Sequence, residues 1–405
     1  MDINNDNDIK RLVEKISEQI TLEKLNKIWK GFNITRFALY KENKGYLSST
    51  CEDKSLVKEI EWNPQHYGNT CILYNNEYLG IWNLNTLSHN ANFDRLFASI
   101  VHELFHGYQS VFCKKDYANE LKAATYTFTK EVVKLMLMER QFLYQAVMET
   151  DNKLKQNYIN SFIVCRSKRI SLNREDILYD LTIESHEGTA SFVEYKALKM
   201  ISGNTKDHLA SFMWNKLYKP KDIIKHFRKG LYATGMFICL LLDEIAGDWQ
   251  QEFQSTNILL YDLLLKYYCP KPSELINENK DCAELIIKNY KQKQEDNFNM
   301  FNEQQGYTVN ISGNIELRGY DPMNIVSRNN KILHKHFLMI KAGNQELVLK
   351  GVIICEHNTN FAKIKKVSFK MKNEPKQQND KVLLFEIGEI KALLQKENNI
   401  YNIIV

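Results

Sequence analysis

The spacing of apolar and polar residues changes along the 405-residue chain. Residues 8–31 carry apolar side chains at helical spacing, whereas residues 33–87 contain the short apolar runs of strands. Within the second stretch, residues 70–84 hold two such runs around Asn75 and Asn76, which predicts a hairpin. The start of the chain is therefore expected to form a helix followed by a layer of strands.

The middle of the chain has mostly helical spacing, from Asn92 to about Gln305. After Gly306 the period changes again. In residues 366–372, apolar side chains alternate with polar ones, which is the spacing of a strand with one buried face. A short helix is expected near Ile390, close to the C-terminal end of this stretch.

These patterns predict an α+β protein with two parts. Residues 1–305 form the larger unit, in which residues 1–90 supply the N-terminal helix and strands and residues 91–305 are helical. Residues 306–405 form a smaller, β-rich C-terminal domain whose role the sequence does not indicate. Hydrophobic residues make up 44% of the chain and charged residues 25%, so the chain has enough apolar side chains for a core of useful size.

One predicted helix carries most of the chemistry. It begins after a candidate cap, Asn92, and its apolar residues recur at helical intervals, which indicates a largely buried helix. His102 and His106 are four residues apart on one side, so both imidazoles can bind one metal ion at about 2.0–2.1 Å. Glu103 completes an H-E-x-x-H pattern, which typically supplies two zinc ligands and a general base. Two buried histidines without partners would be costly, which favours a metal site over a chance match.

A catalytic zinc site needs a third protein ligand and an open fourth position. The longer H-E-x-x-H-x-x-G-x-x-H pattern does not supply it, because Gln109 and Phe112 stand at its last two fixed positions. A second helical segment, residues 180–195, contains Glu187 followed by small residues. Small side chains allow this segment to approach the histidine helix closely, which makes Glu187 the leading candidate.

The same segment offers three alternatives for the third ligand: Glu184, His186 and Glu194. Glu184 lies one turn before Glu187 on nearly the same helix face. Whichever of these residues do not bind the metal are candidates to accept or donate hydrogen bonds around it, since a ligating histidine usually donates its second N–H. Spacing alone leaves the choice among them open.

The segment "HELFHGYQ" followed by "HEGTASFVEY" resembles the gluzincin zinc metallopeptidases, in which H-E-x-x-H and a downstream E-G-x-A-type helix build one site. The resemblance implies a zincin-like catalytic unit with one zinc ion per chain. It makes His102, His106 and Glu187 the ligands and Glu103 the general base. The sequence departs from the group's pattern by having His186 where Asn is common, and by a longer separation between the motifs.

One further feature of the gluzincins has a candidate in this chain, and other residues are candidates on their own account. A tyrosine after the third ligand often stabilises the charge on the carbonyl oxygen, and Tyr232 is expected in this role. His334 and His336, which are expected on the same face of a strand, are candidates for a functional role, and Arg318 is a candidate for binding a substrate carboxylate. Residues 77–84 are expected to form an edge strand that could hold an extended peptide by main-chain hydrogen bonds.

Charge and targeting patterns narrow the class of protein. The net charge is +5 with scattered Lys and Arg, so no nucleic-acid-binding surface is expected. The polar N-terminus is unlike a signal peptide, and no apolar run is long enough for a membrane span. Eight dispersed cysteines without a CxxC pair favour free thiols and a cytoplasmic protein.

The sequence therefore predicts a soluble, cytoplasmic zinc metallopeptidase that acts on a peptide or protein substrate. Two alternatives stay open. One is a zinc hydrolase that acts on a non-peptide amide or a modified small peptide. The other is a catalytically inert zinc-binding relative with a binding or structural role. The sequence does not give cleavage specificity or oligomeric state.

Overall fold

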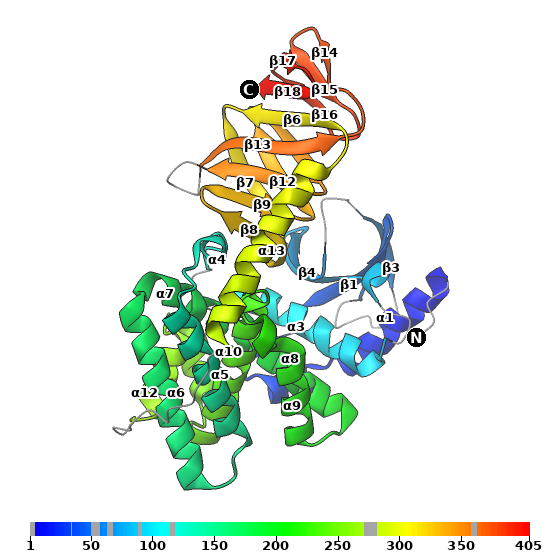
Figure 1. Ribbon diagram of the computed structural model, residues 1–405. Helices are drawn as coiled ribbons and strands as arrows, with labels where there is room; N and C mark the ends of the chain where they lie inside the picture. The colour runs from blue at the N-terminus through cyan, green and yellow to red at the C-terminus, as the bar shows by residue number, and fades with distance from the viewer. Residues whose placement is uncertain are drawn as a thin grey trace. The chain divides into compact units, whose positions relative to one another are not determined.

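The computed structural model describes eight stretches of the chain: residues 5–33, 35–49, 57–62, 68–87, 91–113, 118–270, 282–357 and 363–405. It divides into two compact units. The first comprises residues 1–118 and 132–280, and the second comprises residues 119–131 and 281–405. Figure 1 shows a mainly helical body in the first unit and a β-rich C-terminal region in the second, as the sequence predicts.

The first unit opens with two helices and a five-stranded sheet. The helices are α1 (Asp6–Gln19) and α2 (Leu22–Ile28), and the strands are β1 (Arg36–Lys41), β2 (Lys44–Leu47), β3 (Lys58–Glu61), β4 (Thr70–Tyr74) and β5 (Glu77–Asn83). The sequence predicts a single helix over residues 8–31, but the structure has two helices there. The predicted helix breaks because the Thr21 hydroxyl accepts a hydrogen bond from the backbone of Lys24 and caps a new helix.

The strand order of this sheet is β3-β2-β1-β5-β4. Strands β4 and β5 form the predicted hairpin, with Asn75 and Asn76 at positive φ in its turn. The prediction that residues 77–84 form an edge strand is wrong, because β5 pairs with β1 on one side and with β4 on the other. Among the described strands, β4 is the edge strand at that end of the sheet.

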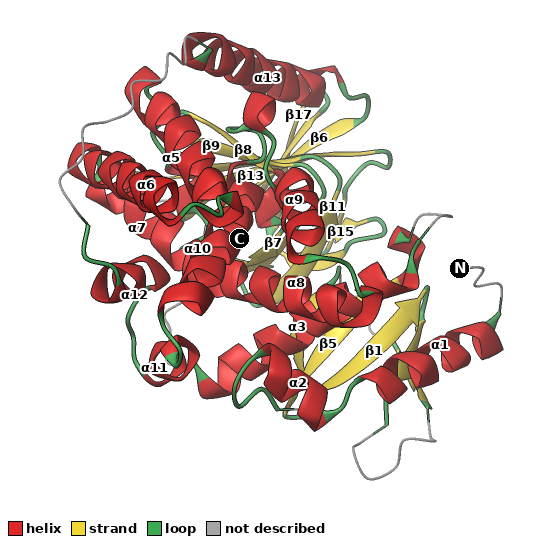
Figure 2. Cartoon of the chain, turned by 90° about the horizontal axis from the view of Figure 1, so that it is seen from below, coloured by secondary structure: helices red, strands yellow, loops and turns green. Residues whose placement is uncertain are grey.

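Helix α3 (Phe93–Phe112) carries the H-E-x-x-H residues and packs against both the sheet and the helical body (Figure 2). Asn92 caps it as predicted, since its side chain accepts from the backbone N–H of Asp94 at 2.7 Å. Gly80 of β5 lets the helix approach the sheet, because a Cβ there would lie 3.2 Å from Leu104 Cδ2. The close approach at Gly80 sets the distance between α3 and the strands β4 and β5.

The helical body completes the first unit. Its helices are α5 (Lys130–Met148), whose first two residues belong to the second unit, α6 (Asn152–Leu172), α7 (Arg174–Ile183), α8 (Thr189–Ser202), α9 (Lys206–Leu217), α10 (Phe227–Ile245), α11 (Trp249–Ser255) and α12 (Leu260–Tyr267). A π-helical segment, Glu184–Gly188, joins α7 to α8 without a break. Trp29, which directly follows α2, packs on Phe105 of α3 and on Trp249 of α11, with ring centroids 4.9 and 5.2 Å apart. These buried aromatic rings hold α3 against the body.

The second unit contains two helices and thirteen strands in the described residues. They are α4 (Lys122–Thr125), α13 (Ala283–Glu303), β6 (Tyr307–Ser312), β7 (Ile315–Tyr320), β8 (Ile325–Arg328), β9 (Lys331–His334), β10 (Phe337–Ala342), β11 (Gln345–Lys350), β12 (Ile353–His357), β13 (Ile364–Met371), β14 (Lys376–Gln378), β15 (Lys381–Leu384), β16 (Gly388–Lys391), β17 (Leu393–Glu397) and β18 (Ile400–Ile404). The largest sheet has the order β17-β18-β6-β13-β12-β9-β8.

Two details of the second unit differ from the sequence predictions. The predicted boundary at residue 306 separates α13 from the strands, but the structure places α13 in the same unit as the strands. Phe298 and Phe301 of α13 pack on Leu333 of β9. The helix predicted near Ile390 is wrong. That residue lies in strand β16 and is buried in the core of this unit, opposite Val382 of β15.

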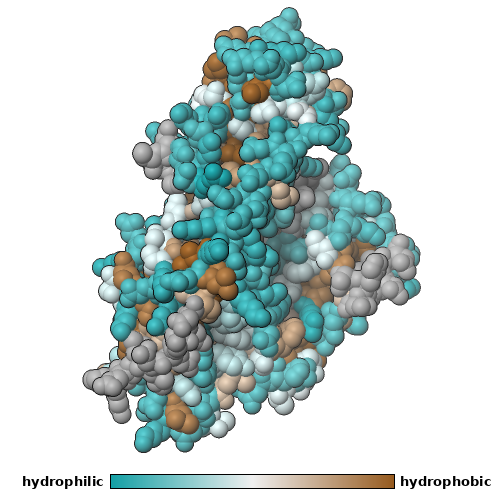
Figure 3. Space-filling model, viewed as in Figure 1, coloured by the Kyte–Doolittle hydropathy of each residue, from teal (hydrophilic) through white to brown (hydrophobic). Residues whose placement is uncertain are grey.

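The surface is mostly hydrophilic on the face shown in Figure 3, with scattered hydrophobic patches. Among the described residues, no helix combines the length and apolar character needed to span a membrane. The longer helices either carry charged residues on an exposed side, as α13 does, or are buried in the body, as most of α10 is.

Candidate metal centre

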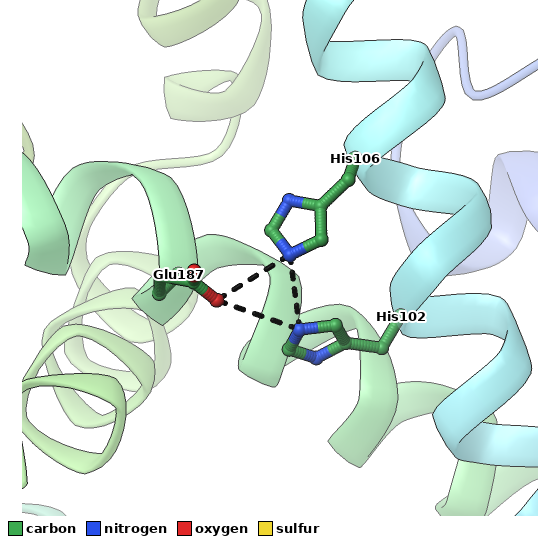
Figure 4. Close-up of side chains that lie close together, drawn as sticks. All are labelled: His102, His106 and Glu187. Atoms are coloured by element: carbon green, nitrogen blue, oxygen red, sulfur yellow. Dashed lines mark hydrogen bonds and ion pairs between the residues drawn. The ribbon is translucent and has the colours of Figure 1, made fainter. Parts of the chain in front are cut away.

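The two predicted histidine ligands project from the same side of α3 (Figure 4). Their Nε2 atoms are 3.1 Å apart, although the residues are separated by a full helical turn. Both side chains are largely buried, with 10% of His102 and 13% of His106 exposed. The pair therefore directs two ring nitrogens at one point in a region from which most solvent is excluded.

Glu187 is the carboxylate that meets these histidines. Its Oε2 atom lies 3.6 Å from Nε2 of His102 and 3.4 Å from Nε2 of His106. It belongs to the π-helical segment between α7 and α8, a distortion that often occurs at functional sites. Among the described residues, His102, His106 and Glu187 are the cluster of His, Cys, Asp and Glu side chains whose donor atoms could hold one metal ion.

The spacing of these three donor atoms fits a tetrahedral zinc ion. With zinc–ligand bonds of about 2.0–2.1 Å, tetrahedral geometry places ligand atoms about 3.3–3.4 Å apart. The three separations here are 3.1, 3.4 and 3.6 Å, which bracket that value. Two imidazoles and one carboxylate are also a donor set that zinc commonly takes when a fourth position is kept open.

Glu184 lies apart from this cluster. Both of its carboxylate oxygens accept hydrogen bonds from Arg166 at 2.7 Å, and Thr234 also donates to it at 2.6 Å. This ion pair is fully buried and belongs to a larger network with Glu139 and Arg169. The arginine pairing occupies the Glu184 carboxylate, which leaves Glu187 as the candidate ligand.

The first of the small residues after Glu187, Gly188, has a different role from the predicted one. Gly188 packs against α10 rather than α3, since a Cβ on it would lie 2.4 Å from Cα of Gly235. A Cβ on Gly235 would in turn lie 2.4 Å from the backbone oxygen of Glu184. The two glycines therefore allow the π-helical segment to lie directly on α10, and the side of the segment that carries Glu187 faces the histidines.

Each histidine has a polar partner at its second ring nitrogen. Nδ1 of His102 lies 3.5 Å from Oε2 of Glu194, and Glu194 is itself held by Lys216 at 2.6 Å and Ser99 at 3.2 Å. Nδ1 of His106 lies 2.7 Å from Oε1 of Gln109. The Gln109 contact orients the His106 ring with Nε2 towards Glu187, and the ion-pair contact places Glu194 at the opposite side of the His102 ring. Glu194 is thus one of the sequence alternatives placed beside a histidine rather than at the metal position.

Arg228 is a site residue that the sequence did not reveal. Its Nη2 atom donates to Oε1 of Glu187 at 2.9 Å, which leaves Oε2 directed at the histidines. Arg228 also donates to the hydroxyl of Tyr232, one turn further along α10. The Tyr232 ring lies parallel to that of His102, with centroids 6.4 Å apart. The structure thus brings the predicted Tyr232 next to the histidine cluster.

The charges around the site favour an ionised Glu187. Burial alone would raise the pKa of this carboxyl, but Arg228 and the two histidines hold it well below its usual range. Burial also raises the pKa of Glu103, and the neighbouring histidines oppose that shift. His186 stacks on His106, with centroids 4.6 Å apart, and burial lowers its pKa to about 3, so it stays neutral.

Zinc affinity is predicted to fall as the pH falls. Burial alone lowers the pKa of His102, but interactions with Glu187 and Glu194 raise it to about 10 in the metal-free chain. Below that pH the ring carries a proton that zinc must displace, which costs about tenfold in affinity per pH unit for each proton. Competition with a chelator, repeated from mildly acidic to mildly alkaline pH, measures the slope. An affinity that stays constant over that range would contradict the assignment.

The remaining candidates from the sequence lie in the second unit. His334 is buried in β9, whereas His336 follows the end of that strand, is exposed and pairs with Asp321 at 2.9 Å. The two histidines therefore do not share a strand face. Arg318 pairs with Glu316 at 2.8 Å on the surface. None of these three residues belongs to the cluster around His102.

The comparisons with known proteins do not assign a function to this chain, so an assignment depends on the residues of the site. The sequence matches no family model, and searches of curated proteins and of solved structures found no match. The resemblance to gluzincins therefore rests on the motif residues, now joined by the spacing of His102, His106 and Glu187.

Proposed function

We propose that this chain is a zinc-dependent peptidase of the gluzincin type, with a zincin-like catalytic unit formed by the N-terminal sheet and the helical body. The observation that carries the proposal is the convergence of His102, His106 and Glu187 at tetrahedral spacing, with Glu103 next to the first histidine. One zinc ion per chain would bind to these three side chains. The substrate would be a peptide or a protein.

The chemistry divides between the metal and the side chains. A bound zinc ion would polarise the scissile carbonyl and lower the pKa of a water molecule to about 7. Glu103 would accept a proton from the attacking water and deliver it to the leaving amine. Its partly exposed position on α3 gives it access to substrate, and its raised pKa favours holding that proton between the two steps.

Strand β4 is the proposed support for the substrate main chain. It is an edge strand among the described residues, and it packs on α3 close to the site. Cys71 of β4 shows this proximity, because its Sγ atom would lie 3.3 Å from a Cβ built on Gly107, the residue after His106. An extended peptide could add to such an edge by backbone hydrogen bonds, which would place its carbonyl groups near the histidines.

Tyr232 is proposed to stabilise the negative charge that develops on the carbonyl oxygen. Arg228 donates to the tyrosine oxygen, so the hydroxyl proton can itself be donated. Tyr232→Phe is expected to lower kcat by about 10²–10³-fold, the range for a lost oxyanion donor. Zinc content should not change, because Tyr232 is not a ligand. Steady-state kinetics together with metal analysis test this, and unchanged kcat would remove Tyr232 from the mechanism.

Digestion of a peptide library tests the proposed activity itself. The zinc-loaded protein is expected to generate new peptide termini, detected by mass spectrometry. A chelator should abolish cleavage, and added zinc should restore it, since the metal is held by only three protein ligands. A library that stays intact in the presence of stoichiometrically bound zinc would contradict the peptidase proposal and favour a non-peptide amide substrate.

We further propose that the enzyme works in the cytoplasm. None of the seven described cysteines forms a disulfide bond, which fits a reducing compartment.

A further inference from the structure

The Gln109 side chain touches both elements that carry the candidate ligands. It lies on α3, three residues after His106, and is 5% exposed. Its Oε1 atom is 2.7 Å from Nδ1 of His106. Its Nε2 atom lies 2.9 Å from the backbone oxygen of His186 and 2.8 Å from Oγ1 of Thr189. These two acceptors stand on either side of Glu187 in the chain.

The partners of Gln109 allow only one orientation of its amide. The backbone oxygen of His186 can only accept, so the nitrogen of the amide must face it. The Thr189 hydroxyl gives its own proton to the backbone oxygen of Ser185 at 2.8 Å or of His186 at 3.0 Å, so it too accepts from Gln109. Both amide N–H groups are thereby used on the segment that carries Glu187, and the amide oxygen is left facing His106.

This orientation in turn selects the tautomer of His106. An amide oxygen can only accept, so Nδ1 of the ring must carry a proton. In the neutral ring, Nε2 is then left with its lone pair directed at His102 and Glu187, 3.1 and 3.4 Å away. Ligation of a metal requires this tautomer, and a hydrogen bond to the other ring nitrogen usually fixes it.

We infer that Gln109 is a positioning residue that couples the two halves of the candidate metal site. It holds His106 in the metal-binding tautomer, and it fixes the π-helical segment Glu184–Gly188 at the distance from α3 at which Glu187 reaches the histidines. The inference rests on the metal site of the proposed function but not on peptidase activity. In the sequence, the same residue appears only as a mismatch to the longer zinc motif.

The test compares two substitutions that separate these roles. Gln109→Met keeps the size of the side chain but removes all its hydrogen bonds. Gln109→Glu keeps an acceptor for His106 but loses both donors and places a carboxylate against the backbone oxygen of His186. Each variant is expected to lower zinc affinity by about 10–100-fold, which is the usual effect of removing a hydrogen bond to a metal-binding residue. Chelator competition measures the affinity without any substrate.

Gln254→Met is the matched control. Gln254 also bridges α3 to another element, since its Oε1 atom accepts from Tyr108 at 2.7 Å and from Trp29 at 2.9 Å. It belongs to α11, and its hydrogen bonds do not involve His102, His106 or Glu187. This variant is expected to lose thermal stability to an extent similar to Gln109→Met, while zinc affinity stays at the wild-type value. A purely structural role for Gln109 would make the two variants behave alike.

Imidazole hydrogen–nitrogen correlation spectra of the metal-free protein provide the second readout. His106 is expected to carry its proton on Nδ1 in the wild type and in Gln109→Glu, and to shift towards the Nε2-protonated form in Gln109→Met. Wild-type His106 with its proton on Nε2 would overturn the inference. So would folded Gln109 variants that bind zinc as tightly as the wild type. A wild type that shows the expected affinities and tautomer but cleaves no peptide would contradict only the proposed function.

Discussion

Glu187→Gln is expected to lose both zinc binding and peptidase activity. A neutral amide is a poor ligand for zinc, and this substitution removes the single negative charge of the ligand set. It also removes the carboxylate that pairs with Arg228 at 2.9 Å and faces both histidines. The loss of zinc affinity should be larger than the decrease of about 10–100-fold that follows substitution of a residue hydrogen-bonded to a metal ligand. Equilibrium dialysis with metal analysis measures it.

Glu184→Gln is the matched control three residues away. Glu184 pairs with Arg166 in the buried network and takes no part in the metal cluster. The variant is therefore expected to keep its zinc while losing folding stability, on the order of 3–5 kcal/mol if the ion pair is effectively broken. Denaturant unfolding of the metal-free proteins separates the two effects. Loss of zinc from folded Glu184→Gln, with full retention by Glu187→Gln, would reverse the assignment.

Glu103→Gln is expected to keep the fold and the zinc ion but to lose turnover by at least about 100-fold, the scale of general acid–base catalysis. The amide has nearly the same shape as the carboxyl group but cannot accept the proton of the attacking water. Glu103 is not one of the three residues whose donor atoms converge, so metal content should be unaffected.

Single-turnover kinetics on a cleaved library peptide, with metal content measured on the same sample, test this prediction. Cleavage at the wild-type rate would show that another group activates the water. Loss of zinc together with activity would instead indicate that Glu103 supports the metal site, which its assignment as a base does not predict.

The local features of the site are visible in the sequence because they depend on neighbours along one helix. The apolar stripe of α3, its Asn92 cap and the four-residue spacing of His102 and His106 are all helical periodicities. A helix with a buried apolar stripe can expose the other side of the same turn to a cavity or a metal. The convergence of the two Nε2 atoms follows from this geometry.

The π-helical segment could not be predicted from helical periodicity. At ordinary helical spacing, Glu184 and Glu187 lie on nearly one face, and their roles cannot be separated. The wider π turn rotates them apart, so that Glu184 meets Arg166 and Glu187 meets the histidines. The segment packs on α10 through contacts such as the approach of Gly188 to Gly235, which helical periodicity does not show because these residues are distant in sequence.

The role of Arg228 and the position of β5 in the sheet could not be predicted, because both depend on contacts between residues that are distant in sequence. Arg228 has several basic neighbours at the start of α10, and only the packing of this helix on the π-helical segment selects it as the partner of Glu187. Strand β5 was predicted as an edge because its sequence does not show that β1 pairs with it in parallel. The hairpin of β4 and β5 was predictable because its turn residues and both strands are contiguous.

A crystal structure of the zinc-loaded protein tests the central claim most directly. We predict one zinc ion bonded to Nε2 of His102, to Nε2 of His106 and to a carboxylate oxygen of Glu187 at about 2.0–2.2 Å. The fourth position should be open to solvent or substrate. A zinc ion bound at other residues, or Glu187 turned away from a zinc ion held by the two histidines, would contradict the assignment.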